Sequence, residues 1–325
     1  MSYQSFIRTK PLLLLMAIAV AFTSCLKEPD FNNNPPDTDM GRAKIEITDG
    51  PIDNPNVSGV YVTVADIKIN GESWAGFKGK ATFDLMALQH GETKLLGDGQ
   101  LEVGTYDNIE LVLHTDTDAD GDSPGCYIKD AQGVKHALAG ANEMTIKVKG
   151  VMATATGQTT ESVIDFDLRR AIVFESGSTT DFEFVTETEL ENAVRLVEKN
   201  TTGNITGNIT DGVSGSDKII VYAYDKGDFG IDEKFPQGPS QIMFKNAVTS
   251  AVVNADGDFN LAFLESGNYE LHFISYQEND EEQLMAHGEL QLNILGSVTI
   301  DLLGIKVDAS DTVDVDLKVT GLQFF

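Results

Sequence analysis

Apolar and polar residues alternate along most of this chain from residue 43 onward, and this period of two is the strongest constraint on its fold. Successive side chains of a β-strand point to opposite faces, so the alternation predicts strands with one buried face. Turn sequences such as Asp49-Gly50-Pro51 and Asn70-Gly71 separate the runs, as in an antiparallel sandwich or barrel. The clearest early runs are Ala43, Ile45 and Ile47; Val60, Val62 and Val64; Ile109, Leu111 and Leu113; Met144, Ile146 and Val148; and Ile164, Phe166 and Leu168.

A polar segment interrupts this pattern and predicts a domain boundary. Asn200–Gly215 is rich in Asn, Thr, Gly and Ser, and the alternation resumes beyond it, from Ile219 to Val319. In that part Tyr222 and Tyr224 alternate with Val221 and Ala223, so one face of their strand must be buried. The sequence therefore predicts an all-β protein with two antiparallel β-sandwich domains in tandem, over residues 42–200 and 201–325.

One stretch departs from the strand pattern. Thr186 followed by Glu189 resembles a helix capping box, and Leu190, Ala193, Val194 and Val197 lie at helical spacing. We expect a helical turn over residues 187–193, followed by a strand over Val194–Val197.

The N-terminus is typical of a secreted protein. Arg8 and Lys10 precede the apolar run Pro11–Phe22, which is too short to span a bilayer but suits a secretory signal. The ending Thr23-Ser24-Cys25 resembles a bacterial lipobox, which implies a signal peptide over residues 1–24 and acylation of Cys25, including palmitate, as the attachment to a lipid bilayer. The alternative is an ordinary secretory peptide with an incidental cysteine.

Residues 25–41 are rich in proline, asparagine and acidic side chains and are predicted to form an extended tether. Lys27-Glu28 resembles the signal that takes Bacteroidetes-type lipoproteins to the outer face of the outer membrane. We expect an outer-membrane lipoprotein, and the sequence leaves both a surface-exposed and a periplasm-facing position open.

The charge and the cysteine content of the chain limit the kinds of partner it can bind and the ways in which its domains can be stabilised. The chain has 23 basic and 51 acidic residues, a net charge of −28 that argues against nucleic acid as a partner. Removal of residues 1–24, which hold two basic and no acidic side chains, takes the charge from −28 to −30. Cys126 is then the only cysteine besides Cys25, so the domains must be stabilised by packing. We interpret Cys126 as a small buried residue rather than a nucleophile.

The first domain resembles the domain of unknown function 4382 of Bacteroidetes-type lipoproteins. The resemblance rests on the order and spacing of several short motifs over about residues 42–200, and it implies fold and compartment only. The motifs are Ile47–Asp53, Val60–Val64, Trp74, Phe83-Asp84-Leu85, His90-Gly91, Leu101–Tyr106 and Ile164–Leu168.

The second domain resembles the carboxypeptidase-regulatory or transthyretin-like sandwiches that often follow such a domain. The residues that support this are Thr202–Gly207, Asp256–Leu261 and Glu265–Leu271. The expected architecture is therefore two consecutive transthyretin-like or immunoglobulin-like sandwiches.

One acidic segment offers a candidate metal site. Asp116, Asp118, Asp120 and Asp122 alternate, and Gly121 stands at the sixth position, as at the start of a calcium loop with oxygen ligands. The twelfth position is Tyr127 rather than the glutamate of an EF-hand, and no helices are expected around the segment. The two interpretations are a calcium loop, with Ca²⁺ as the cofactor, and a solvated acidic hairpin tip.

The sequence contains no recognisable catalytic motif. The five histidines lack zinc spacing, and HExxH, GxSxG, a P-loop and GxGxxG are all absent. We therefore expect a non-enzymatic lipoprotein with a binding or structural role outside the cytoplasm, its partner an extracellular glycan or protein. The alternatives are a fimbrial or pilus-type subunit that exchanges its last strand, Val313–Val319, and a polysaccharide-processing accessory protein.

Overall fold

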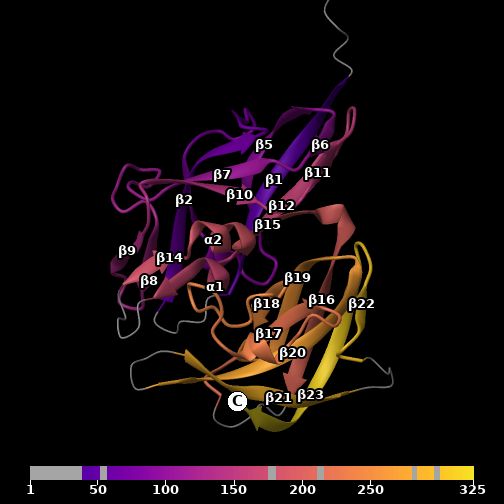
Figure 1. Ribbon diagram of the computed structural model, residues 1–325. Coiled ribbons are helices and arrows are strands. Elements are labelled where there is room, and N and C mark those ends of the chain that lie inside the picture. The colour runs from indigo at the N-terminus through magenta and orange to yellow at the C-terminus, as the bar shows by residue number, and fades with distance from the viewer. Residues whose placement is uncertain (1–38, 52–56, 175–180, 211–215, 280–283, 296–300) are drawn as a thin grey trace, which may run out of the picture. The chain divides into compact units, whose positions relative to one another are not determined.

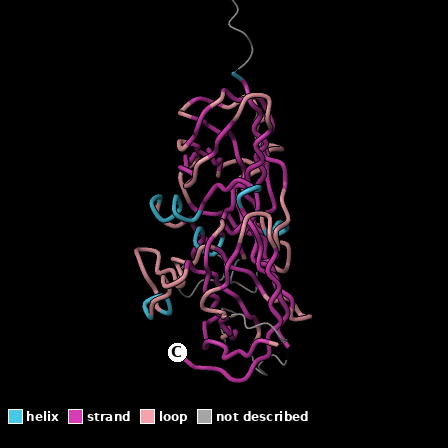
Figure 2. Tube along the Cα trace, turned by 90° about the vertical axis from the view of Figure 1, so that its right-hand side faces the viewer, coloured by secondary structure: helices cyan, strands magenta, loops and turns pink. Residues whose placement is uncertain are grey.

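The computed structural model describes residues 39–51, 57–174, 181–210, 216–279, 284–295 and 301–325 (Figure 1). The signal peptide, Cys25 and nearly all of the tether therefore lie outside the described residues. Residues 38–325 form one compact unit. The described residues are 60% strand and 8% helix, so the all-β prediction is confirmed (Figure 2).

The first sandwich has a small sheet in the order β15–β12–β1–β5. β1 pairs in parallel with β12 and antiparallel with β5, so the predominantly antiparallel pattern contains one parallel pair. Ile45 and Ile47 of β1 and Ile164 of β12 are fully buried, as the alternation predicts. These strands are β1 (Met40–Gly50), β5 (Lys94–Glu102), β12 (Thr159–Asp167) and β15 (Val194–Glu198).

A larger sheet packs against the first one in the order β10–β7–β2–β8–β9–β14–β13, with β3 and β4 on β2. One continuous core, which includes Val62, Leu111 and Trp74, lies between the two sheets. The strands are β2 (Val57–Ile69), β3 (Glu72–Ser73), β4 (Ala81–Asp84), β7 (Ile109–His114), β8 (Tyr127–Asp130), β9 (Lys135–Ala139), β10 (Glu143–Val148), β13 (Ile172–Phe174) and β14 (Phe182–Phe184), beside a ribbon of β6 (Gly104–Tyr106) and β11 (Met152–Thr154).

Short helices join these strands. The expected helix over 187–193 is present as α2 (Glu187–Ala193), and β15 begins at Val194, so both predictions are confirmed. The Thr186 hydroxyl donates to the Glu189 carboxylate at 2.6 Å and does not cap a backbone N–H. The remaining helical turns are α1 (Leu168–Ala171), η2 (Met86–Leu88), η3 (Lys199–Thr201) and η4 (Ile231–Lys234).

The second sandwich is one folded sheet in the order β18–β17–β20–β21–β23–β16–β19, with β22 on β20. It also contains a parallel pair, between β16 and β23. Its core includes Ile205, Phe273 and Leu317. The strands are β16 (Thr202–Thr210), β17 (Lys218–Asp225), β18 (Thr249–Val252), β19 (Asp258–Glu265), β20 (Gly267–Glu278), β21 (Leu284–Ile294), β22 (Ile305–Val307) and β23 (Thr312–Phe324).

Strand β17 is buried on both faces. Val221 and Ala223 face the second core, whereas Tyr222 and Tyr224 belong to a separate apolar cluster with Phe244 from the loop before β18. Tyr222 stacks on Phe244 with ring centroids 4.5 Å apart. The loop thus covers the face of β17 that carries the two tyrosines, and the alternation alone does not show that this face is buried.

None of the described helices has the length and apolar content needed to cross a membrane.

Candidate functional site

The acidic segment after β7 forms a turn organised by one of its own carboxylates. Asp118 is buried, and its Oδ1 accepts hydrogen bonds from the backbone N–H groups of Asp120 and Asp122 at 3.0 and 2.8 Å. The Lys135 ammonium lies 3.9 Å from the other oxygen of Asp118, and Asp116, Asp120 and Asp122 are exposed. The described residues contain no group of three or more acidic, His or Cys side chains placed to hold a metal ion. Calcium binding by this segment stays a prediction.

Cys126 lies fully buried between the two sheets of the first sandwich. Burial raises the pKa of its thiol to about 11, so the thiol is protonated at neutral pH. Because the thiolate is the nucleophilic form, Cys126 has the properties of a packing residue, as the sequence suggested.

A groove of about 1020 Å³ lies beside β15, a volume suited to a ligand of several rings or residues. Its walls come from the β10–β11 connection, α2, the loop before β18 and the ends of β17 and β19. The charged side chains that line it are Lys149, Arg170, Glu189, Arg195, Glu198, Asp225, Asp228, Lys245 and Glu265.

The basic side chains of the groove differ in whether they already bond to another residue. The Arg195 guanidinium donates to Asp165 at 2.8 Å, and Arg170 donates to the Asn192 carbonyl at 2.7 Å. Lys149 and Lys245 make no side-chain hydrogen bond or ion pair with any residue that the structure describes. These two lysines are therefore free to meet an anionic group of a ligand.

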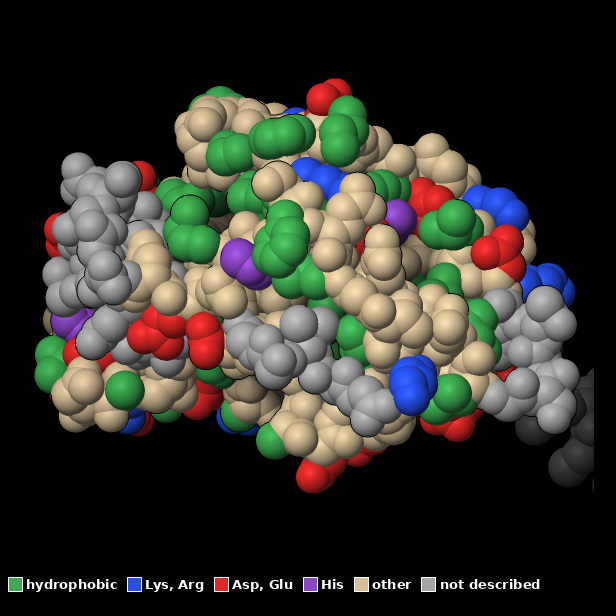
Figure 3. All heavy atoms as spheres, turned by 90° about the horizontal axis from the view of Figure 1, so that it is seen from below, with side chains coloured by type: hydrophobic (Ala, Val, Ile, Leu, Met, Phe, Trp, Pro, Cys, Tyr) green, Lys and Arg blue, Asp and Glu red, His purple; other side chains and the backbone are tan. Residues whose placement is uncertain are grey.

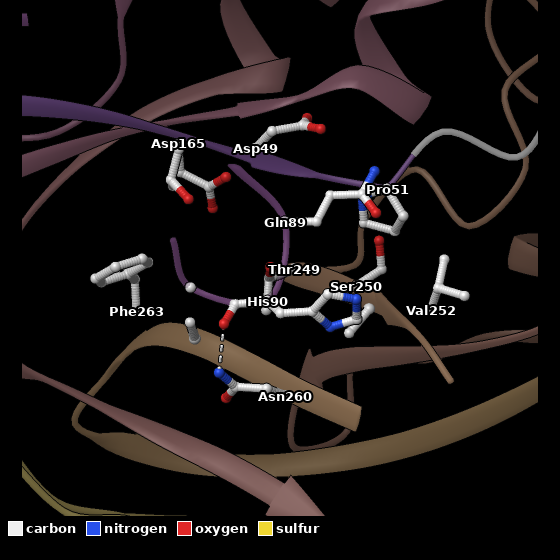
Figure 4. A pocket seen from close by; sticks show the side chains of 14 residues that line it. Asp49, Pro51, Gln89, His90, Asp165, Thr249, Ser250, Val252, Asn260 and Phe263 are labelled. Carbon is white, nitrogen blue, oxygen red and sulfur yellow. Dashed lines mark hydrogen bonds between the residues drawn. The ribbon is translucent and has the colours of Figure 1, made fainter. Parts of the chain in front are cut away.

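A second, much smaller pocket lies where the first sandwich meets β18 and β19 (Figure 4). Three of the motifs that support the family resemblance converge on it: Thr48–Pro51 at the end of β1, His90-Gly91 after η2, and Asp165 on β12. From the second sandwich, Ser250 and Asn260 complete the lining. Segments that are far apart in the sequence thus form one polar site.

The turn after η2 is held in a specific conformation. His90 has φ 61°, a left-handed conformation that is uncommon for a residue with a Cβ, and Gly91 follows with φ 85°. The Thr48 hydroxyl lies 3.0 and 2.7 Å from the carbonyls of Leu88 and Glu92, on either side of the turn. The His90 carbonyl accepts a hydrogen bond from the Asn260 amide at 2.7 Å, drawn as the dashed line in Figure 4.

Asp49 is the most perturbed acid of this pocket. Burial raises its pKa well above the ordinary value, and the neighbouring carboxylates of Asp165 and Asp167 raise it further. Hydrogen bonds from the Leu168 backbone and the Gln89 side chain act in the opposite direction. Asp49 differs from its two acidic neighbours because it has no cationic partner among the described residues.

The two neighbouring carboxylates are paired with arginines. Asp165 accepts two hydrogen bonds from Arg195, at 3.0 and 2.8 Å. Asp167 lies 3.3 Å from Arg169 and 3.9 Å from Arg170. Burial also raises the pKa of Asp165, against the effect of Arg195.

The sequence placed Asp49 in a turn, and it marked Asp49, His90 and Asp165 as parts of a family pattern rather than as a site. Alternation places Asp165 and Asp167 opposite Ile164 and Phe166, on a face that most strands turn to solvent. In the structure both acids are buried. The burial of Asp165 and Asp167 depends on contacts between distant segments, which the alternation along one strand does not show. In the sequence, only the arginines at 169, 170 and 195 pointed to partners for these acids.

The comparisons with known proteins support the family resemblance of the first sandwich. Residues 40–183 match the family model described as Domain of unknown function (DUF4382). This match includes the β1, His90 and Asp165 motifs of the small pocket. No curated protein matches the chain.

Several solved structures match the chain at low similarity. The minor pilin GBS52 of Streptococcus agalactiae is 11% identical with a TM-score of 0.20, over 87% of this chain and 98% of that one. The major pilin subunit BcpA of Bacillus cereus is 9% identical with a TM-score of 0.21, over 86% and 99%. The Bacillus anthracis TIE protein is 10% identical with a TM-score of 0.20 over 86% of this chain, which spans only 34% of its length. At these TM-scores the likenesses support no inference about function.

Proposed function

We propose that this protein is a lipoprotein of the cell envelope, anchored through Cys25, whose β-sandwich body binds an anionic ligand outside the cytoplasm without catalysis. The lipobox-like ending at Cys25 and the tether after it support the anchor and the compartment. On this proposal the second sandwich is a carboxypeptidase-regulatory or transthyretin-like domain that helps to form the binding groove.

The observation that supports ligand binding best is the pair of unpartnered lysines in the groove. The chain has more than twice as many acidic as basic residues, yet Lys149 and Lys245 are not used in any ion pair with a described residue. None of the described residues that line the groove is aromatic, so recognition would depend on charge and hydrogen bonds rather than on ring stacking. The groove also contains five carboxylates, so a matching ligand carries separate anionic groups that reach the two lysines, as in an acidic extracellular polysaccharide with spaced charges.

The binding proposal is tested by titrating the full-length protein in detergent with polygalacturonate and, separately, with neutral dextran. We expect calorimetric binding of the acidic polymer only, weakening as salt rises because the contact is electrostatic. The double variant Lys149→Ala/Lys245→Ala should bind at least tenfold more weakly. Lys306→Ala is the control, since Lys306 is exposed on β22 and pairs with Asp308 outside the groove. Equal binding by the double variant and the parent would contradict the proposal.

The anchor has an independent test. The parent should incorporate radiolabelled palmitate and fractionate with membranes, whereas Cys25→Ser should do neither. Labelling of both proteins, or of neither, would remove the lipoprotein assignment and leave the groove proposal untouched.

A pilus-type subunit is the second candidate, and exposed apolar residues on the last strand, β23, and on its neighbour β21 favour it. Phe324 is 66% exposed and Met285 is 55% exposed. Seen from below, the molecule shows separate apolar side chains scattered among polar ones (Figure 3). Against strand exchange, β23 is hydrogen-bonded on both sides, to β16 and to β21. We expect the purified protein to remain monomeric on concentration, whereas a strand-exchanging subunit would form ladders resistant to mild detergent.

A further inference from the structure

Asp49 is a buried acid at the junction between the two sandwiches. The residue is only 7% exposed, although it stands near the end of β1 in a turn sequence. It lines the small pocket of Figure 4, to which β18 and β19 of the second sandwich contribute Ser250 and Asn260. A change in the charge of Asp49 therefore acts on the place where the two sandwiches meet.

No basic side chain among the described residues forms an ion pair with Asp49. The neighbouring strand β12 brings Asp165 and Asp167 beside it, because the parallel register pairs Asp49 with Phe166 between them. The cations of this region come from α1 and β15 and bond to those two acids instead; they are Arg169, Arg170 and Arg195. An ionised Asp49 thus has two carboxylates beside it and no cationic partner of its own.

The other groups around Asp49 do not supply a charge. The Leu168 N–H donates to Asp49 Oδ1 at 3.3 Å, and the Gln89 side chain is a second hydrogen-bond partner. Oδ2 is buried and has no partner within the described ranges. Besides the acids, His90 is the one titratable side chain among the described residues that line the pocket, and it is exposed. The lining residues of β18 and β19 are all neutral.

The pocket leaves little room to hydrate a charged Asp49. Its volume is about 20 Å³, by a measure in which one water needs roughly 10–15 Å³, so it holds one water. A buried carboxylate without a partner is costly, and such a group usually stays neutral instead. Fuller hydration of the carboxylate requires the pocket to open, which separates the His90 carbonyl from the Asn260 amide that donates to it at 2.7 Å.

We propose that Asp49 is a pH-sensitive switch of this junction: the pocket is closed over the neutral carboxyl group and opens when Asp49 loses its proton. Burial and the two neighbouring carboxylates raise the pKa of Asp49 well above its ordinary value of 3.8. The folded protein therefore keeps this proton to a higher pH than the unfolded chain does. The resulting stabilisation is complete below pH 3.8 and disappears as the pH rises through the pKa of the folded state. An acidic environment tightens the junction, and an alkaline one loosens it.

The proposal is tested by comparing the full-length parent in detergent with Asp49→Asn, which keeps the shape of the side chain and stays neutral at every pH. Thermal unfolding is followed by circular dichroism from pH 4 to pH 9. We expect the melting temperature of the variant relative to the parent to increase with pH, so that the variant melts at least about 2 °C higher at pH 9. If Asp49→Asn melts below the parent at every pH, or does not fold, the charge of Asp49 is stabilising and the proposal is wrong.

Asp167→Asn is the matched control. It makes the same change at a buried acid that pairs with Arg169, so it should lower the melting temperature at pH 9. If it raises the melting temperature as much as Asp49→Asn does, the effect belongs to the acidic group as a whole and the assignment to Asp49 is wrong.

Opening of the pocket has a separate measurement. Amide hydrogen exchange is compared between the parent and Asp49→Asn at the same pH, so that the intrinsic exchange rate cancels. Peptides that contain His90 or Asn260 should exchange several-fold faster in the parent at pH 9 and equally in both proteins at pH 5. Equal exchange at both pH values, together with a higher melting temperature of the variant, would show that Asp49 affects stability without opening the junction and would overturn the switch.

Discussion

Glu46 shows how a single acid on β1 can connect distant parts of the chain. Its carboxylate accepts hydrogen bonds from Thr93 at 2.7 Å and from Lys199, and it pairs with Lys44 at 2.9 Å. Lys199 begins η3, the turn that leads into the second sandwich. Burial opposes ionisation, but the hydrogen bonds from Lys199, Lys44 and Thr93 lower the pKa of Glu46 from 4.5 to about 2.

This lowered pKa predicts acid-sensitive stability. An acid whose pKa is depressed by folding stabilises the protein above its unfolded value of 4.5, and this contribution disappears as the pH falls towards 2. Glu46→Gln should lower the free energy of unfolding at pH 7 by about 1–2 kcal/mol, because both lysines remain partly hydrated. Urea titrations of parent and variant at several pH values should show this difference shrinking between pH 4.5 and 2. A difference that does not depend on pH would mean that the carboxylate charge is not responsible.

Charge spacing in the sequence was a poor guide to which acids matter. The evenly spaced acids from Asp116 to Asp122 suggested a metal site, yet one carboxylate oxygen of Asp118 accepts hydrogen bonds from backbone N–H groups of its own turn. Asp49, which stands in an ordinary turn sequence, is a buried acid without an ion pair to a described residue. The difference arises from long-range packing, since the hydrogen-bond partners of Asp49 are the Leu168 backbone and the Gln89 side chain.

At the scale of elements, each of the two sandwiches contains the same type of connection between consecutive strands. Glu102-Val103-Gly104-Thr105-Tyr106 joins β5 to β6, and Glu265-Ser266-Gly267-Asn268-Tyr269 joins β19 to β20. In each, the tyrosine hydroxyl donates to the carbonyl of the residue four positions earlier, at 2.7 Å. The ring lies over the glycine, so the hydroxyl fixes the corner between two strands, as in the tyrosine corner of immunoglobulin-type sandwiches.

Removing either hydroxyl should therefore destabilise the protein measurably. Tyr106→Phe and Tyr269→Phe should each lower the free energy of unfolding by about 1 kcal/mol, the usual contribution of such a hydrogen bond. Tyr127→Phe is a matched control, because its ring is buried but its hydroxyl has no hydrogen bond to another described residue. Chemical denaturation of the three variants gives the comparison. Equal effects at all three positions would show that the corner bonds contribute nothing specific.

Element types could be predicted from the sequence, whereas strand partners could not. Periodicity identified the strands through Ile45, Val62 and Ile164, and the spacing around Leu190 gave α2 with its correct ends. The parallel pairing of β1 with β12 and of β16 with β23 has no local signal, because both strands of each pair alternate as antiparallel strands do. The burial of Tyr222 and Tyr224 likewise depends on a loop that packs over β17.

At the scale of the whole described unit, Arg169 is the principal polar connection between the sandwiches. It belongs to α1 of the first sandwich, and its guanidinium donates to the carbonyls of Met243 and Phe244 at 2.6 and 3.1 Å. The guanidinium also lies 5.1 Å from the centre of the Tyr222 ring, and the side chain is 2% exposed. One buried cation thus holds the loop that covers β17.

Truncation of this arginine should uncouple the two sandwiches. Removing one partner of a buried ion pair typically costs about 3–5 kcal/mol. Arg169→Ala would leave two carbonyls without their donor and Asp167 with Arg170 as its remaining partner. We expect the parent to unfold in a single calorimetric transition and Arg169→Ala to show two, because the second sandwich loses its covering loop first. Arg195→Ala is the comparison, since Arg195 bonds Asp165 within the first sandwich. That variant should lower the melting temperature and keep one transition. If Arg169→Ala also unfolds in one step, apolar contacts such as those of Ile242 with the first core are sufficient to keep the sandwiches coupled.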